Sequence, residues 1–339
     1  MPRPVSRWPL GGALAAVAAS VALACVTGDA PLVAADSTRL QEIEVRAAYQ
    51  QLRARVFRIG HRLRSRAVAL CGDLLLPDPG LLLAAPDRSA ALVPDDGSLG
   101  AKLVADASAG LRVVLVAPQA PAARLGVLAG DVVLALDGQP IADVGQLNAG
   151  LLAAADREVT LTLRCSQRSY DVVTRIPAVC GVPISFSEDW GLMTFQDGYG
   201  VAVPYGLVET VDDDALAIAI AHQMAHSLIE LAEHGVEDVE ATADRLGLLI
   251  AASAGFDPAL APAFWTWLAS ENPWRIPRSS AARLVRPHPE IRGGAIRYPA
   301  WQLHLGIAAR MPGIRATVEE IERLRATASG PGDDLRIDP

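Results

Sequence analysis

Two histidines four residues apart, His222 and His226, have the types and spacing in this sequence that best fit metal chemistry. They stand in "AIAHQMAHSL", where a helix is expected. Residues four apart lie on one face of a helix, so both imidazoles could hold one zinc ion. In an HExxH arrangement the residue after the first histidine is a glutamate, the general base of metal-assisted hydrolysis. Here that residue is Gln223, and an amide is not basic near neutral pH.

The spacing of the histidines also has a simpler explanation. A pair four apart arises by chance in a helix-rich chain. His222 and His226 could then be half-buried polar residues, hydrogen-bonded to Asp244 or Gln223 without a metal. Weak metal binding and this metal-free arrangement both fit the residues.

The elements that must position these residues fall into three groups. The stretch 36–76 is expected to form one long N-terminal helix, and the proline- and aspartate-rich stretch 77–97 a connector. Short β-type runs follow, and from Cys180 two strand-like runs lead into helices. The strand-like runs are 111–118, 131–138, 157–165, 169–176, 182–189 and 199–210, and the helices begin near Asp212 or span 236–254, 259–270 and 288–311.

Residues 98–177 resemble a PDZ domain. The evidence is "VVLVAPQAPAARLGVLAGDVVLALDGQPI", with a short helical turn in "PAARLG" and a tight turn at Asp137-Gly138, followed by a helix in "VGQLNAGLLAAA". The resemblance implies that an extended peptide adds a strand beside this helix and that backbone N–H groups hold its C-terminal carboxylate. The matching loop is Ser98, Leu99, Gly100 and Ala101. A PDZ fold that serves only as a spacer is the alternative.

Residues 180–300 resemble peptidase family M forty-eight, the group of HtpX and the CAAX prenyl endopeptidases. The resemblance rests on "DDDALAIAIAHQMAHSL", on "VEATADRLGLLIAASAGFDP" and on the later "HPEIR". It implies a mainly helical, zincin-like metallopeptidase domain with a small sheet. Together with the PDZ-like domain, the expected fold class is α+β.

The departures from this family pattern fall on the chemistry. Gln223 stands at the general-base position, and aligning "EATAD" with ExEAD puts Thr242 at the third zinc ligand. Asp238, one helical turn earlier, is a possible substitute ligand. Asp244 keeps the family's aspartate, which orients a histidine from outside the ligand shell. His288 keeps the later His-Pro, but the arginine expected six residues on is absent.

The first 24 residues read as a signal peptide, with arginines before a short run of small apolar residues. The run ends in "ALAC", which resembles a bacterial lipobox, so Cys25 is a candidate lipidation site; ordinary cleavage before Cys25 is the alternative. Export to the periplasm or cell envelope permits disulfides. One pair and one remaining thiol among Cys71, Cys165 and Cys180 is the simplest arrangement.

Because an inserted PDZ domain must begin and end close together, Cys71 and Cys180, which bracket it, are the expected disulfide. Residues 178–325 would then form the peptidase-like domain and 326–339 a flexible tail. The formal net charge of -8 argues against nucleic acid as a partner. Polypeptides or protein C-termini are the expected partners, and a lipid anchor at Cys25 would hold the protein on a membrane.

The sequence thus favours a catalytically impaired homologue of a metallopeptidase that binds polypeptide, with zinc weakly bound or absent. An active zinc endopeptidase with an unusual ligand set is one alternative. A structural PDZ scaffold is the other.

Overall fold

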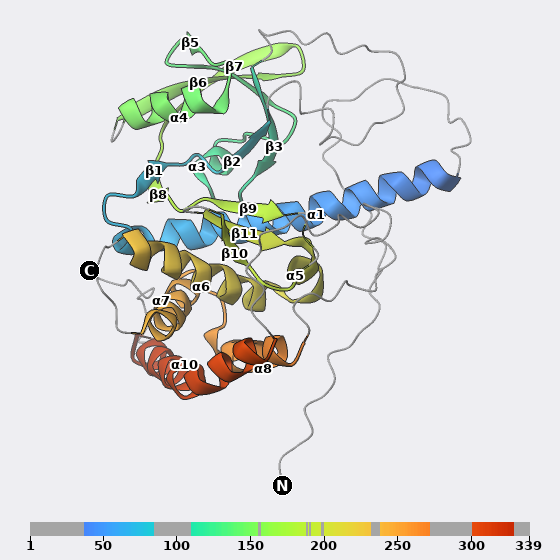
Figure 1. The fold of residues 1–339 in the computed structure, drawn as a ribbon. Coiled ribbons are helices and arrows are strands. Elements are labelled where there is room, and N and C mark those ends of the chain that lie inside the picture. The colour runs from blue at the N-terminus through green and yellow to red at the C-terminus, as the bar shows by residue number, and fades with distance from the viewer. Residues whose placement is uncertain are drawn as a thin grey trace. The chain divides into compact units, whose positions relative to one another are not determined.

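The computed structural model describes residues 37–84, 110–154, 157–187, 189, 191–197, 200–231, 238–271 and 300–328. These residues form a mixture of helices and short β-sheets (Figure 1). Two separate hydrophobic cores hold them together. One belongs to the β-rich segment, residues 81–84 and 111–176, and the other joins the N-terminal helix to the described elements that follow Cys180.

The β-rich segment is an antiparallel sheet in the order β2-β3-β4-β6-β7, with β5 paired to β4. Alternate residues of each long strand face the core, and helix α4 covers it with Leu147 and Leu151. The turn at Asp137-Gly138 has φ angles of 49° and 75°, as a tight hairpin turn requires. The elements are β2 (Leu81–Ala84), β3 (Leu111–Val116), α3 (Pro121–Arg124), β4 (Val132–Leu136), β5 (Gln139–Pro140), α4 (Val144–Ala153), β6 (Glu158–Cys165) and β7 (Arg168–Arg175).

The remaining elements surround helix α6 (Asp213–Leu231), whose residues from Ala215 to Met224 are buried except for Gln223. Helix α7 packs closely on it, since a Cβ at Gly247 would lie 2.8 Å from the His222 backbone. A sheet in the order β10-β11-β9 lies beside these helices in the same core. The other elements are α1 (Ser37–Arg66), β9 (Ile184–Ser187), β10 (Phe195–Asp197), β11 (Gly200–Pro204), α5 (Tyr205–Thr210), α7 (Val239–Ser253), η2 (Pro258–Leu260), α8 (Ala261–Ser270) and α10 (Ala300–Ala328).

The two segments that lead into and out of the β-rich segment lie side by side. After α1 come the short helix η1 (Val68–Leu70) and strand β1 (Leu75–Pro77), and β1 pairs with β8 (Ala178–Cys180). A disulfide joins Cys71 to Cys180, as expected from the sequence, with 5.5 Å between the Cα atoms. Cys165 takes no part in this bridge.

Several expected element boundaries differ from the observed ones. The N-terminal helix ends at Arg66 instead of near residue 76, and strands β1 and β2 occupy part of the expected helix end and connector. The second half of the strand-like run 199–210 is helix α5. Helix α10 begins at Ala300 and continues to Ala328, into the stretch expected to be a flexible tail.

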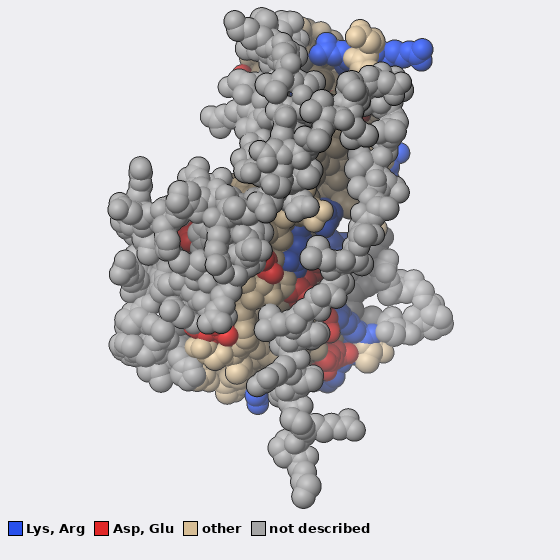
Figure 2. Space-filling model, turned by 90° about the vertical axis from the view of Figure 1, so that its right-hand side faces the viewer, with Lys and Arg blue, Asp and Glu red and all other residues tan. Residues whose placement is uncertain are grey.

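Basic and acidic groups both appear among the described residues that are visible in Figure 2. Among the helices that the structure describes, none combines the length and apolar character needed to span a bilayer.

Candidate metal centre

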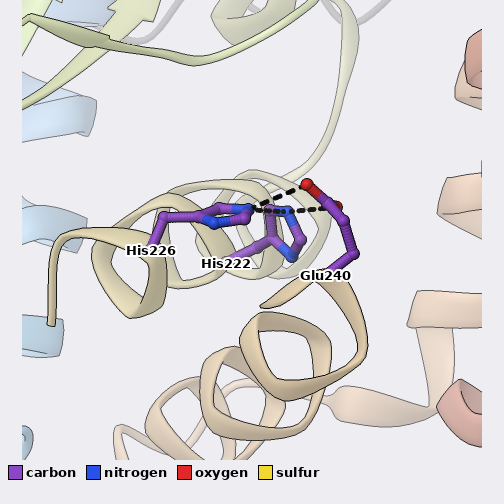
Figure 3. Close-up of side chains that lie close together, drawn as sticks. All are labelled: His222, His226 and Glu240. Atoms are coloured by element: carbon purple, nitrogen blue, oxygen red, sulfur yellow. Dashed lines mark hydrogen bonds and ion pairs between the residues drawn. The ribbon is translucent and has the colours of Figure 1, made fainter. Parts of the chain in front are cut away.

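Both histidines lie on helix α6, and burial of this helix in the core fixes their positions. Its first turn is capped by Asp212, whose Oδ1 accepts a hydrogen bond of 2.9 Å from the Ala215 amide, and Asp213 and Asp214 follow in that turn. Three turns later the His222 side chain is only 6% exposed and that of His226 15% exposed. The two Nε2 atoms lie 3.0 Å apart (Figure 3).

Glu240, in the first turn of α7, completes the cluster (Figure 3). Its Oε1 lies 3.4 Å from His226 Nε2 and its Oε2 lies 3.6 Å from His222 Nε2. Zinc ligands held about 2.0–2.1 Å from an ion in tetrahedral geometry are about 3.3–3.4 Å apart. The observed separations of 3.0, 3.4 and 3.6 Å bracket this value, so the three donors fit a shared zinc ion.

Asp244 lies behind the cluster, with its side chain 4% exposed. Its Oδ1 is 3.0 Å from His222 Nδ1, and its Oδ2 is 3.0 Å from Arg310 Nε on α10. A carboxylate at Nδ1 favours the proton on that nitrogen and leaves the Nε2 lone pair for a ligand. The centroids of the Trp265 and His222 rings lie 5.1 Å apart, and this edge-on packing limits rotation of the imidazole.

Arg310 brings a positive charge to the cluster. It forms an ion pair with Glu240 as well as with Asp244, and its guanidinium lies 5.7 Å from the Trp265 ring. Burial and the adjacent His222 lower the pKa of His226, against the opposing effect of Glu240. A neutral His226 is the form that binds metals.

The expected third ligand, Thr242, is not in the cluster, because it lies on another face of α7. Asp244 faces His222, and the residue on the same face one turn earlier is Glu240. Thr242 lies two residues from both, about 200° around the helix. Its hydroxyl donates a 2.8 Å hydrogen bond to the Asp238 carbonyl oxygen.

Asp238 is also engaged elsewhere. It is the N-cap of α7, and its Oδ1 accepts a 3.0 Å hydrogen bond from the Ala241 amide. It therefore stabilises the helix that carries Glu240 instead of replacing a ligand.

The other expected site residues divide between those described and those outside the described residues. Gln223 is half-buried on α6, next to the histidine face. His288, Cys25 and the loop 98–101 lie outside the described residues. Their proposed roles stay predictions. Glu240 was not among the expected ligands, although it lies four residues before Asp244 and so on the same face of the helix.

Comparisons with known proteins address the β-rich segment. The PDZ domain family matches residues 112–164. A crystal structure of the HtrA3 PDZ domain bound to a phage-derived ligand is 20% identical, with a TM-score of 0.25, and the match covers 32% of this chain and 92% of that one. An HtrA-type protease, AlgW, with a decapeptide is 21% identical, with a TM-score of 0.24, and the match covers 33% of this chain and 32% of that one.

No curated protein matches the chain by sequence. None of these comparisons supports the expected membership of peptidase family M forty-eight. The expected PDZ domain is confirmed by the family match, which lies inside the stretch 98–177. The chain therefore contains a PDZ domain.

Proposed function

We propose that this protein binds polypeptide through its PDZ domain and carries a zinc centre that lacks the base needed for efficient peptide hydrolysis. One observation carries the proposal. His222, His226 and Glu240 bring ligand atoms within 4.8 Å of one another, while the residue after the first histidine is an amide, Gln223.

The donor set supports zinc. Two imidazoles and one carboxylate form a three-ligand zinc set that leaves one position open. Glu240 is half exposed, so the cluster is open to solvent on its side. A carboxylate beside the second ring nitrogen, as Asp244 is beside His222 Nδ1, is the usual partner of a metal-binding histidine.

Binding rather than cleavage follows from Gln223. A zinc ion in such a site can polarise a carbonyl group and lower the pKa of a water molecule. Proton transfer then needs a base, and the amide of Gln223 cannot accept a proton near neutral pH. The histidines and Glu240 would hold the ion, and Asp244 would fix the orientation of His222.

An active zinc endopeptidase is the second candidate, and Glu240 favours it. The sequence departs from the family pattern at the base, at the third ligand and at the later arginine, and Glu240 would supply the third ligand. Export to the cell envelope, with or without a lipid at Cys25, remains part of the proposal. A structural scaffold that binds neither zinc nor peptide is the outcome that both experiments below would detect.

Metal analysis of the dialysed full chain tests the zinc centre. We expect one zinc ion per chain, and we expect Glu240→Gln and His226→Ala to weaken binding strongly in a competition titration. Glu158→Gln, at an exposed position of β6, is the matched control and should bind as the unchanged protein does. A Glu240→Gln variant that binds zinc normally would remove Glu240 from the site.

Peptide binding is tested with an array in which each peptide carries either a free or an amidated C-terminus. A PDZ groove recognises the free carboxylate, so amidation should abolish binding of the preferred sequences. Binding that ignores the C-terminus, or no binding, would contradict this part of the proposal. Casein-type substrates should remain uncleaved in the presence of zinc.

A further inference from the structure

A cleft of about 960 Å³ lies beside helix α1 and is rich in arginine. Its walls come from α1, from the end of α7 with the turn after it, and from the PDZ segment that includes α3. Five arginines line it: Arg58, Arg62, Arg66, Arg124 and Arg325.

The charge of this arginine cleft is not neutralised by its own carboxylates. Asp78 and Asp213 also line it, but each pairs with an arginine that is not part of the lining. Asp78 pairs with Arg64 at 2.9 Å, and Asp213 pairs with Arg55. The five lining arginines therefore leave a net positive cleft on a chain whose formal net charge is -8.

Arg58, Arg62 and Arg66 form a row on one face of α1. They are four residues apart and exposed, so successive guanidinium groups step about 6 Å along the helix axis. Among the described residues, the arginines of α1 that form ion pairs with carboxylates are Arg55 and Arg64, and neither of them belongs to this row.

Arg62 is held in position by the turn after α7. Its guanidinium carbon lies 4.4 Å from the centre of the Phe256 ring. A Cβ at Gly255, where φ is +77°, would lie 2.4 Å from Arg62 Nη2, so only glycine leaves room for this arrangement. Stacking uses the face of the guanidinium and leaves its in-plane N–H groups directed outward.

The two other arginines donate hydrogen bonds to backbone carbonyl oxygens in the walls of the cleft. Arg325 Nη2 donates to the carbonyl oxygens of Ala252 and Phe256 at 2.9 and 3.0 Å. Arg124 Nη1 donates to the Gln119 carbonyl oxygen at 2.7 Å. The row on α1 therefore supplies the donors for a ligand, between walls that the other two stabilise.

We propose that the arginine cleft binds a short acidic stretch of extended polypeptide. Alternate side chains of an extended chain are about 6.6–6.8 Å apart, close to the step of the arginine row. Aspartate or glutamate at alternate positions would thus meet successive guanidinium groups, each of which can hold a carboxylate with two hydrogen bonds. A concave cleft suits such a segment better than a flat membrane surface, and the acidic remainder of the chain repels a long polyanion.

The test is fluorescence anisotropy on the full chain with two labelled heptapeptides of the same composition. One alternates aspartate and alanine, and the other carries its aspartates in one block. Both are amidated at the C-terminus, so that the PDZ groove does not capture them and a failure here leaves the proposed function untouched. We expect the alternating peptide to bind more tightly and the affinity to fall as salt is added.

Arg58→Gln/Arg66→Gln is the informative variant, because Arg62 also packs on Phe256 and its loss could disturb the fold. We expect this variant to bind the alternating peptide at least about tenfold more weakly, with unchanged zinc content. Arg168→Gln/Arg175→Gln, on exposed positions of β7, makes the same change of charge elsewhere and should bind normally. Equal losses in both variants would show non-specific attraction and overturn the proposal. The proposal would also be overturned if neither peptide bound while anionic phosphatidylglycerol vesicles bound through the same arginines.

Discussion

Gln223 lies on α6 one residue after His222 and three before His226, at about 60° around the helix from the latter. Its half-buried side chain borders the ligand face, where a base would have to act. We predict that Gln223→Glu alone gives zinc-dependent peptide hydrolysis, since a general base typically contributes about 10²–10⁴-fold. Cleavage of a fluorogenic casein substrate, with and without chelator, measures it.

Thr242→Glu is the matched control for this prediction. If Thr242 were at the ligand position, a carboxylate there would raise zinc affinity by orders of magnitude. Because Glu240 is the proposed third ligand, we expect Thr242→Glu to leave zinc affinity and hydrolysis unchanged. A gain of zinc binding in Thr242→Glu would support the alignment of "EATAD" with ExEAD and contradict Glu240 as the third ligand.

A substitution at Asp244 tests whether the carboxylate beside His222 Nδ1 strengthens zinc binding. Asp244→Asn keeps the size of the side chain but removes the charge that faces His222 Nδ1 and Arg310. Loss of such a partner typically lowers metal affinity about 10–100-fold. We expect a fall of this size in a zinc competition titration, with the far-UV circular dichroism unchanged; an unchanged affinity would show that Asp244 does not position His222.

The residues of the site could be predicted from the sequence only in part. His222 and His226 follow from helical spacing, and Asp244 follows from its family-like context. Glu240 was missed because the alignment matched letters in "EATAD", whereas contact between α6 and α7 depends on which residues share a face. The ion pairs of Arg310 with Glu240 and Asp244 join segments about seventy residues apart, and no local pattern carries that information.

Among the elements, the PDZ strands were predictable and the connectors were not. The strands from β3 to β7 alternate apolar residues and are separated by turns of recognisable type. Strands β1 and β2 lie in a stretch rich in proline and aspartate, and β1 forms only because β8 comes back beside it. The "VPYGLVET" stretch has β-type residues, but most of it forms helix α5, which packs against α1 in the core.

Asp78 links α1 to the start of the PDZ segment, and its charge makes this link sensitive to acid. Burial alone would raise the pKa of Asp78, but His61, the Arg64 charge and the Gly80 amide together lower it. A lowered folded-state pKa stabilises the fold fully above the unfolded pKa of about 3.9 and loses this contribution as the pH falls below it.

We therefore expect Asp78→Asn to lower the thermal unfolding temperature at pH 7, and the difference from the unchanged protein to shrink near pH 3. Thermal scans followed by circular dichroism at both pH values measure this. Asp73→Asn, an exposed carboxylate five residues earlier, is the control and should have little effect at either pH. A difference that is as large at pH 3 as at pH 7 would show that the charge of Asp78 is not the cause.

The chain leaves one hydrophobic core at Cys71 and returns to it at Cys180. Both cysteines belong to the core built around α6, while the PDZ core between them is separate. The disulfide closes a loop with a sequence separation of 109. Closing a loop of this length restricts the unfolded chain, and the chain-entropy treatment gives a stabilisation of about 4–5 kcal/mol.

We predict that replacing both cysteines, in Cys71→Ala/Cys180→Ala, lowers the free energy of unfolding by about 2–5 kcal/mol. Replacing both leaves no unpaired thiol at the site, so the loss reports the missing bridge. Urea unfolding followed by tryptophan fluorescence measures it in the α6 core, because the segment 112–164 contains no tryptophan. Cys165→Ala is the control and should unfold at the same urea concentration as the unchanged protein. Adding reductant should destabilise the unchanged protein but not the double variant; a double variant as stable as the unchanged protein would mean that β1–β8 pairing alone holds the two segments together.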